Sequence, residues 1–80
     1  MVHAAALLGD NVRLRRDRRD LTQQEAAERA SIEVKHWQLI EAGGTNPTLA
    51  TLLALAKALD IEVHELLRFK TPQSRARRSR

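Results

Sequence analysis

The chain has 80 residues, a formal net charge of +4 and no cysteine. A chain of this length can form one small domain with a compact core, and without cysteine it has no disulfide framework, thiolate metal site or cysteine nucleophile. The apolar run in MVHAAALLG is too short for a signal peptide and follows no basic residue, and nothing approaches the ~18 apolar residues that span a membrane. We therefore expect a soluble, cytoplasmic protein.

The positive charge is concentrated in two segments of the chain. Residues 1–67 contain eight basic and all ten acidic side chains, so this part carries a charge of about −2. Residues 68–80 contain six basic side chains and no acid. The basic groups therefore cluster within residues 13–19 and near the C-terminus. Both clusters could attract a polyanion, or they could simply be solvated.

The first two predicted helices come from periodicity and from a capping signal. Alanine and leucine are abundant, β-branched and aromatic residues are sparse, and no two-residue alternation persists, so we expect helices and no strands. Leu8, Val12 and Arg16 recur at helical spacing and predict a helix over residues 5–19. The following TQQE is a capping box, in which the threonine and glutamate side chains each bind the other residue's backbone N–H. It predicts a helix over residues 22–30.

Three further helices are expected in the rest of the chain. One is predicted over residues 33–42, ended by Gly43, and a short bend separates it from the preceding helix, as in a helix-turn-helix. After the turn TNP, a threonine caps a helix over residues 49–60. The expected broad apolar face of this helix comprises Leu49, Leu52, Leu53, Leu55, Ala56 and Leu59. VHELLRF predicts a short helix over residues 63–69, and the polar, basic PQSRARRSR is expected to be disordered.

The sequences LTQQEAAERASIEVKHWQLIEAG and NPTLATLLALAKALDIEVHELL resemble the XRE family, the lambda-repressor-like helix-turn-helix domains of bacteria and phages. The resemblance covers roughly Leu8 to Leu67. It implies an all-α, five-helix domain over residues 5–69, with the helix-turn-helix in its second and third helices, and a basic tail over residues 70–80. It also implies a homodimer that inserts the third helix into the major groove of double-stranded DNA. Gln23 would contact phosphate and steady a base-reading neighbour.

The positions that the family uses on DNA supply a set of candidate residues. They are Gln23, Gln24, Glu33, Val34, Lys35, Gln38, Leu39, Thr45 and Asn46. Gln38 could pair with adenine, Lys35 with guanine or phosphate, and Val34 could contact a thymine methyl group. Glu33 departs from the Ser or Thr that normally caps this helix, and it repels the DNA backbone but could accept from a cytosine amino group. Leu39 replaces a residue that is often polar, and can contact only methyl groups or protein.

Other positions implied by the resemblance concern the core and the bend. Arg16 and Glu41 occupy positions at which many members have a partly buried ion pair between the first and third helices. Trp37 stands where Ile, Leu or Val is usual, facing a leucine position that is Ala26 here. This exchange roughly conserves volume and favours a core role for Trp37, with an acceptor for its indole N–H; the alternative is an exposed, base-stacking or partner-binding role. Ser31 replaces a common glycine and costs roughly 1 kcal/mol if its φ is positive.

Two further surfaces could contribute a dimer contact and additional affinity for DNA. The apolar residues of the fifth helix, with the end of the fourth, are the candidate dimer contact because they would otherwise form an exposed patch. They are Val63, Leu66, Leu67 and Phe69. Alternatively, Leu66 and Leu67 simply close the monomer core. The tail could add affinity for phosphates to a weakly charged reading helix, or could only keep the protein soluble. Its arginines are Arg75, Arg77, Arg78 and Arg80.

No catalytic, metal or cofactor site is expected. His3, His36 and His64 are scattered, with no carboxylate or cysteine at ligand spacing, and no Gly-rich phosphate loop is present. Nothing after Leu67 could form a small-molecule effector domain. We therefore expect a small transcriptional regulator rather than an enzyme, associated with the nucleoid when it binds a palindrome with half-sites about one helical turn apart. The alternative is an interaction module or antitoxin that uses apolar third- and fifth-helix residues to bind a partner such as a toxin or polymerase.

Overall fold

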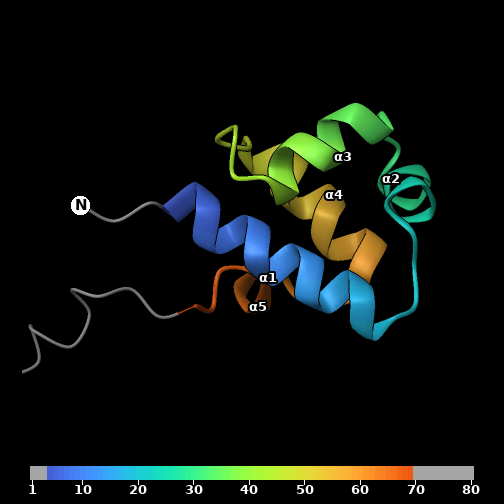
Figure 1. Ribbon diagram of the computed structural model, residues 1–80. Helices are drawn as coiled ribbons and strands as arrows, with labels where there is room; N and C mark the ends of the chain where they lie inside the picture. Colours follow the sequence, from blue (N-terminus) through green and yellow to red (C-terminus); the bar gives the residue numbers. More distant parts are fainter. Residues whose placement is uncertain (1–3, 70–80) are drawn as a thin grey trace, which may run out of the picture.

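The structure is a computed structural model that describes residues 4–69, which form five helices and no strand (Figure 1). The helices are α1 (Ala4–Arg18), α2 (Gln23–Ala30), α3 (Val34–Glu41), α4 (Leu49–Leu59) and α5 (Val63–Leu66). The predicted all-α, five-helix fold is therefore confirmed. The main difference is α5, for which the sequence predicts residues 63–69 but which ends at Leu66.

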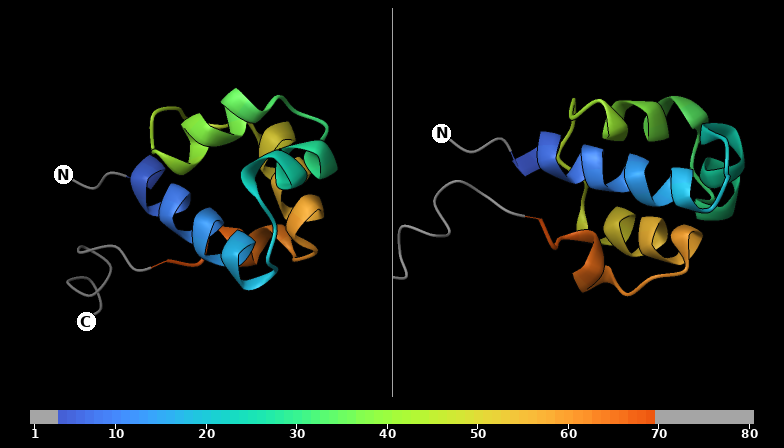
Figure 2. Two further views of the ribbon diagram at one scale, coloured as in Figure 1. Left: turned by 45° about the vertical axis from the view of Figure 1, so that its right-hand side comes forward. Right: turned by 60° about the horizontal axis from the view of Figure 1, so that its bottom comes forward.

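The helices are arranged so that α3 occupies one side of the molecule. α1 lies between α3 on one side and α5 on the other, and α2 packs near the end of α1 (Figure 2). At the end of the molecule away from α2, three segments meet: the start of α1, the α3–α4 connection and the last described residues. There, Ala5, Pro47 and Phe69 line one shallow groove. α3 therefore has a free outer surface and a base built from α1 and α2.

The ends of α2 and the start of α4 follow from local capping. Thr22 Oγ1 accepts from the Glu25 backbone N at 3.0 Å, and Glu25 Oε1 accepts from the Thr22 backbone N at 2.8 Å, which completes the expected capping box. α2 ends at Ser31, whose φ of 59° places a non-glycine residue in the left-handed region. Thr48 caps α4 by accepting from the Thr51 backbone N at 3.2 Å. The bend between α2 and α3 thus carries the backbone cost that the sequence indicates, roughly 1 kcal/mol.

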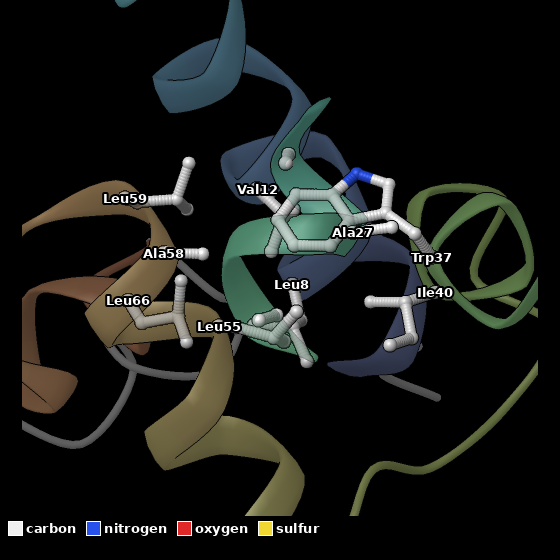
Figure 3. Packing of buried hydrophobic residues seen from close by; sticks show 11 residues of the cluster. Leu8, Val12, Ala27, Trp37, Ile40, Leu55, Ala58, Leu59 and Leu66 are labelled. Carbon is white, nitrogen blue, oxygen red and sulfur yellow. The ribbon is translucent and has the colours of Figure 1, made fainter. Parts of the chain in front are cut away.

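The core is a single cluster of side chains from all five helices (Figure 3). Its members are Leu8, Val12, Ala26, Ala27, Ala30, Trp37, Ile40, Leu55, Ala58, Leu59 and Leu66. Trp37 is fully buried, as expected of a core residue, and its indole ring points into the cluster. Ala26 is also fully buried, which agrees with a large side chain on α3 filling the space left by a small one on α2.

Two expectations about leucine positions are wrong. Leu66 is fully buried in the monomer, so it cannot serve as the exposed dimer contact that the sequence suggests. Leu49 and Leu53 are 68% and 51% exposed, although the sequence places them on the apolar face of α4. Successive helical residues are rotated by about 100°, so Leu53 and Leu55 point about 200° apart and cannot both face one core. Leu55 takes the buried side.

Gly9 allows α1 and α3 to approach each other closely. A Cβ atom at this position would lie 2.5 Å from the Ile40 carbonyl oxygen and 2.6 Å from the Glu41 carbonyl oxygen, which is closer than such atoms can stand. Gly9 is about two helical turns before Arg16 and on the same face of α1. The absence of a side chain therefore brings that face of α1, including Arg16, against the end of α3.

Candidate nucleic-acid interface

α2, the bend over residues 31–33 and α3 form the expected helix-turn-helix, with α3 on the surface (Figure 1). Trp37 and Ile40 point inward and are buried. Three side chains of α3 are exposed: Lys35, Gln38 and Leu39. These three residues form the outer face of α3. They would present one ammonium group, one amide and one leucine side chain to a DNA groove that α3 enters.

The remaining predicted DNA-contact residues lie at different distances from this face. Gln23 at the start of α2 is half-buried, and its Oε1 accepts from Gln38 Nε2 at 3.4 Å. Its neighbour Gln24 is exposed. Thr45 and Asn46 lie in the α3–α4 connection, and Asn46 lines the groove at the far end of the molecule. Gln23 of α2 and Gln38 of α3 thus contact each other at the outer face of α3, whereas Asn46 belongs to a separate surface.

The start of α3 has unusual electrostatics. Glu33 is its N-cap residue, is exposed, and makes no side-chain hydrogen bond to the helix. Its negative charge suits the positive end of the helix dipole. Val34, the first residue of the helix, is half-buried and packs against the core. Glu33 and Lys35 together leave the exposed start of α3 without net charge, so α3 itself attracts phosphate only weakly.

Directly beneath this face, the Glu41 carboxylate accepts four hydrogen bonds from three residues. Arg16 donates from Nε to Oε2 at 2.6 Å and from Nη2 to Oε1 at 3.1 Å. Gln23 Nε2 donates to Oε1 at 2.9 Å, and Trp37 Nε1 donates to Oε2 at 2.6 Å. Arg16 Nη1 also donates to the Leu21 carbonyl at 2.8 Å. The expected Arg16–Glu41 contact is thus part of a larger cluster that connects α1, α2 and α3.

The cluster keeps Glu41 ionised despite its burial. Burial by itself would raise the pKa of Glu41, but the hydrogen bonds from Arg16, Gln23 and Trp37, together with the charge of Arg16, outweigh it and hold the pKa below its ordinary value. The hydrogen bond to Glu41 likewise raises the pKa of Arg16, against the effect of desolvation. The sequence analysis did not predict that Gln23 and Trp37 also donate to Glu41. The contact with Trp37 could have been inferred, because Trp37 and Glu41 are four residues apart and so share one helix face.

Arg15 of α1 and Arg19, directly after α1, are engaged away from α3. Arg15 Nη1 lies 3.6 Å from Glu65 Oε1, and Arg19 Nη2 lies 3.4 Å from Asp60 Oδ2. These carboxylates belong to α5 and to the end of α4, on the side of α1 opposite α3 (Figure 2). Such partly exposed pairs contribute little to stability. Their positions nevertheless mean that the basic run over residues 13–19 is not a single surface beside α3.

The rest of the described chain offers few other sites. Over residues 4–69, no group of three or more histidine, cysteine, aspartate or glutamate side chains is placed to hold a metal ion. In the same range, no helix is both long enough and apolar enough to cross a membrane. The arginines predicted for the basic tail lie outside the described residues; they are Arg75, Arg77, Arg78 and Arg80.

Comparisons with known proteins agree with this geometry. The family model described as a helix-turn-helix domain matches residues 7–69. An HTH-type transcriptional regulator, y4dJ of Sinorhizobium fredii, is 40% identical over 62 residues, which are 76% of this chain and 79% of that protein. Control protein C.SmaI of Serratia marcescens is 38% identical over 61 residues, 76% of this chain and 73% of that protein. The structure of the restriction-modification controller protein C.AhdI of Aeromonas hydrophila superposes with a TM-score of 0.76 at 32% identity, covering 78% and 94% of the two chains.

Replacing Glu41 by Gln tests the carboxylate cluster. The variant keeps the size of the side chain and one acceptor but removes the buried carboxylate partner of Arg16, so we expect a loss of about 3 kcal/mol in unfolding free energy at pH 7. A carboxyl group whose folded pKa is depressed stabilises fully above its unfolded pKa of about 4.3, and this contribution is lost as the pH falls through the folded pKa. The difference between the parent and Glu41→Gln should therefore shrink below pH 4.3. Urea unfolding followed by circular dichroism measures it.

The matched control for this prediction is Glu62→Gln, because Glu62 is exposed and makes no side-chain capping hydrogen bond at the start of α5. This variant should unfold like the parent at every pH. A Glu41→Gln penalty that stays constant from neutral to strongly acidic pH would contradict the role given to the Glu41 charge.

Proposed function

This chain belongs to the helix-turn-helix domain family of DNA-binding transcription regulators, and we propose that it binds a two-fold symmetric operator as a homodimer, with α3 in the major groove of each half-site. The observation that carries the proposal is the exposed polar face of α3, held on α1 and α2 by the Glu41 cluster. On chromosomal DNA the protein would be cytoplasmic and associated with the nucleoid.

Some residues of α3 and its N-cap can form hydrogen bonds with base edges, and others can make only apolar contacts. Lys35 suits guanine or a phosphate, and Gln38 suits adenine. Glu33 can accept from a cytosine amino group, which would offset its repulsion of the backbone. Val34 is half-buried, so only part of its side chain can meet a thymine methyl group. Leu39 is 47% exposed and lies against Gly44, so it too contributes apolar contacts at the end of α3.

The test of DNA reading is selection of binding sites from a random duplex library. We expect one palindromic motif with half-sites about one helical turn apart. Lys35→Ala and Gln38→Ala should each cost roughly 1–3 kcal/mol on the selected site, because each removes a base-edge contact. Lys57→Ala is the matched control, since Lys57 is exposed on α4, and its effect should be small. Failure to enrich any motif would refute the proposal and favour the interpretation in which Leu39 contacts a partner protein.

The dimer contact that we propose lies at the end of the molecule where α4 begins. Leu49 and Leu53 are exposed one turn apart on α4, and Leu67 is 46% exposed. Leu67 also lines a groove of about 130 Å³, together with Leu52 of α4 and Phe69. A domain of this size seldom exposes several large apolar side chains together unless they meet a partner. The patch lies beyond the end of α3, so a second copy bound there leaves the outer face of α3 accessible to DNA.

An acidic substitution at one exposed leucine of this patch tests the dimer. Leu53→Glu should yield a monomer at micromolar concentration in sedimentation velocity, because it places a charge in an apolar contact. Its affinity for a full palindrome should fall towards its affinity for one half-site. Leu14→Glu is the matched control, since Leu14 is 48% exposed and belongs to α1, outside the proposed patch. A parent protein that sediments as a monomer, or a control that dissociates equally, would argue against this surface.

A second proposal concerns the basic C-terminal segment over residues 70–80. Glu33 offsets the charge of Lys35 at the exposed start of α3, and Arg15, Arg16 and Arg19 are engaged by carboxylates. The C-terminal segment contains five basic residues and no acid, and it follows Phe69, which lines the same groove as Asn46. We propose that its arginines supply phosphate contacts in addition to those of the folded part.

The salt dependence of binding measures this contribution. Replacing Arg75, Arg77, Arg78 and Arg80 together by Gln should make the slope of log K against log salt shallower by roughly 3–4, at about 0.9 for each phosphate that is no longer neutralised. The base preferences of the selected motif should not change, since phosphate contacts carry no sequence information. The same four positions changed to Lys should keep the parent slope. An unaltered slope in the Gln variant would show that the segment only solvates the protein.

A further inference from the structure

We propose that Asn11 of α1 is a positioning residue for the dimer: it holds the end of α5, and with it the apolar side chains that a second copy contacts. The proposal rests on the dimer contact proposed above. Asn11 is half-buried and belongs neither to α3 nor to the exposed leucines of the patch. Changing it is therefore expected to alter self-association and to leave the contacts of α3 with DNA unchanged.

The end of α5 differs from the ends of the other four helices in the described part of the chain. A helix leaves its last backbone carbonyls without partners, and a residue in the left-handed region commonly closes the chain over them. Each of the first four helices is followed within two residues by such a residue; these are Asp20, Ser31, Gly43 and Asp60. After α5, Leu67 has a φ of −95°, so this kind of closure does not occur there.

Asn11 supplies a cap for α5 from another helix. Its Nδ2 donates to the Leu66 carbonyl at 2.7 Å and to the Glu65 carbonyl at 3.2 Å, so both hydrogens of one amide group are used. Its Oδ1 accepts from Arg15 Nε at 3.3 Å. Because an arginine side chain can only donate, this contact fixes which end of the amide faces α5. The last carbonyls of α5 are thus bound by a side chain that α1 orients.

The capped carbonyls lie directly before residues of the proposed dimer contact. Leu66 is fully buried, whereas the next residue, Leu67, is 46% exposed. Leu67 and Phe69 line the apolar groove together with Leu8. Leu8 is three residues before Asn11, so both lie on the same side of α1. A helix of four residues has too few internal hydrogen bonds to fix the path of the chain that follows it. The cap from Asn11 therefore determines where Leu67 and Phe69 lie.

Loss of this cap should act on both members of a dimer. Each protomer must place its own apolar contact, so the dimer weakens with the square of the fraction of protomers in which the end of α5 is correctly placed. A change that leaves about 30% of the protomers competent would weaken the dimer about 10-fold. A single half-site of DNA contacts one α3, so its affinity does not depend on this fraction.

The experiment compares Asn11→Asp with the parent. An ionised aspartate has nearly the same shape but can only accept hydrogen bonds, so it cannot bind the two carbonyls. We expect the dimer dissociation constant, measured by analytical ultracentrifugation, to rise about 10-fold or more. The affinity for DNA with a single half-site should stay close to that of the parent. Asn11→Ala should raise the dissociation constant by a smaller factor, because water can replace the lost donor and no negative charge faces the carbonyls.

Hydrogen exchange locates the effect within the chain. The Arg68 backbone N donates to the Glu65 carbonyl at 3.2 Å, just after α5. The Arg68 amide hydrogen should exchange faster in Asn11→Asp than in the parent, whereas the amide hydrogens of α3 should keep their rates. Thr22→Ala is the matched control for stability, because it removes the cap of α2 and leaves α5 untouched. It should not change the dimer dissociation constant.

The possible results separate the role of Asn11 from the dimer contact itself. If Asn11→Asp dimerises as tightly as a dimeric parent, Asn11 has no role in positioning and the dimer contact still stands. An equal loss of dimer in Thr22→Ala would show that lower stability of the domain explains the effect. A parent that is a monomer, or one that dimerises equally well with Leu53→Glu, refutes the proposed dimer contact and the role of Asn11 with it.

Discussion

Among residues 4–69, Glu41 is the only charged side chain that is buried, and the helix-turn-helix is assembled around its requirements. Removing a carboxylate from water costs several kcal/mol unless donors replace the lost hydration. Here the donors come from α1, α2 and α3 itself, so the three helices must keep their mutual positions for the charge to be accommodated. The close approach of α1 and α3 at Gly9 serves the same arrangement, because any added side chain there would separate Arg16 from its partner.

The described residues form three distinct surfaces. One side presents α3, and the opposite side is occupied by ion pairs that join α1 to α4 and α5. The third surface is the apolar end formed by the start of α4 and the last described residues. The proposed DNA contacts on α3 and the proposed dimer contact therefore use different side chains.

The starts of α2 and α4 could be predicted because their signals are local. The capping box at Thr22 and the threonine cap at Thr48 depend on residues within one turn, and the sequence shows them directly. The buried face of the leucine-rich helix α4 could not be predicted in the same way, because its periodicity allows more than one apolar stripe. Only the packing of the other helices determines that Leu55 is buried and Leu53 is exposed. The ion pair of Arg16 and Glu41 came from a family resemblance. The contacts of Gln23 with Glu41 and Gln38 join residues 18 and 15 positions apart, and no local pattern indicates them.

Trp37 has a consequence for how the molecule can be observed. It is the only tryptophan of the chain, fully buried, with its indole N–H bound to the central carboxylate. The emission of an indole depends on the polarity around it and on the groups that it contacts. The protein's intrinsic fluorescence therefore comes from one site, directly beneath Gln23 and Gln38. A change in its spectrum reports on the junction of three helices, and no external dye has to be attached.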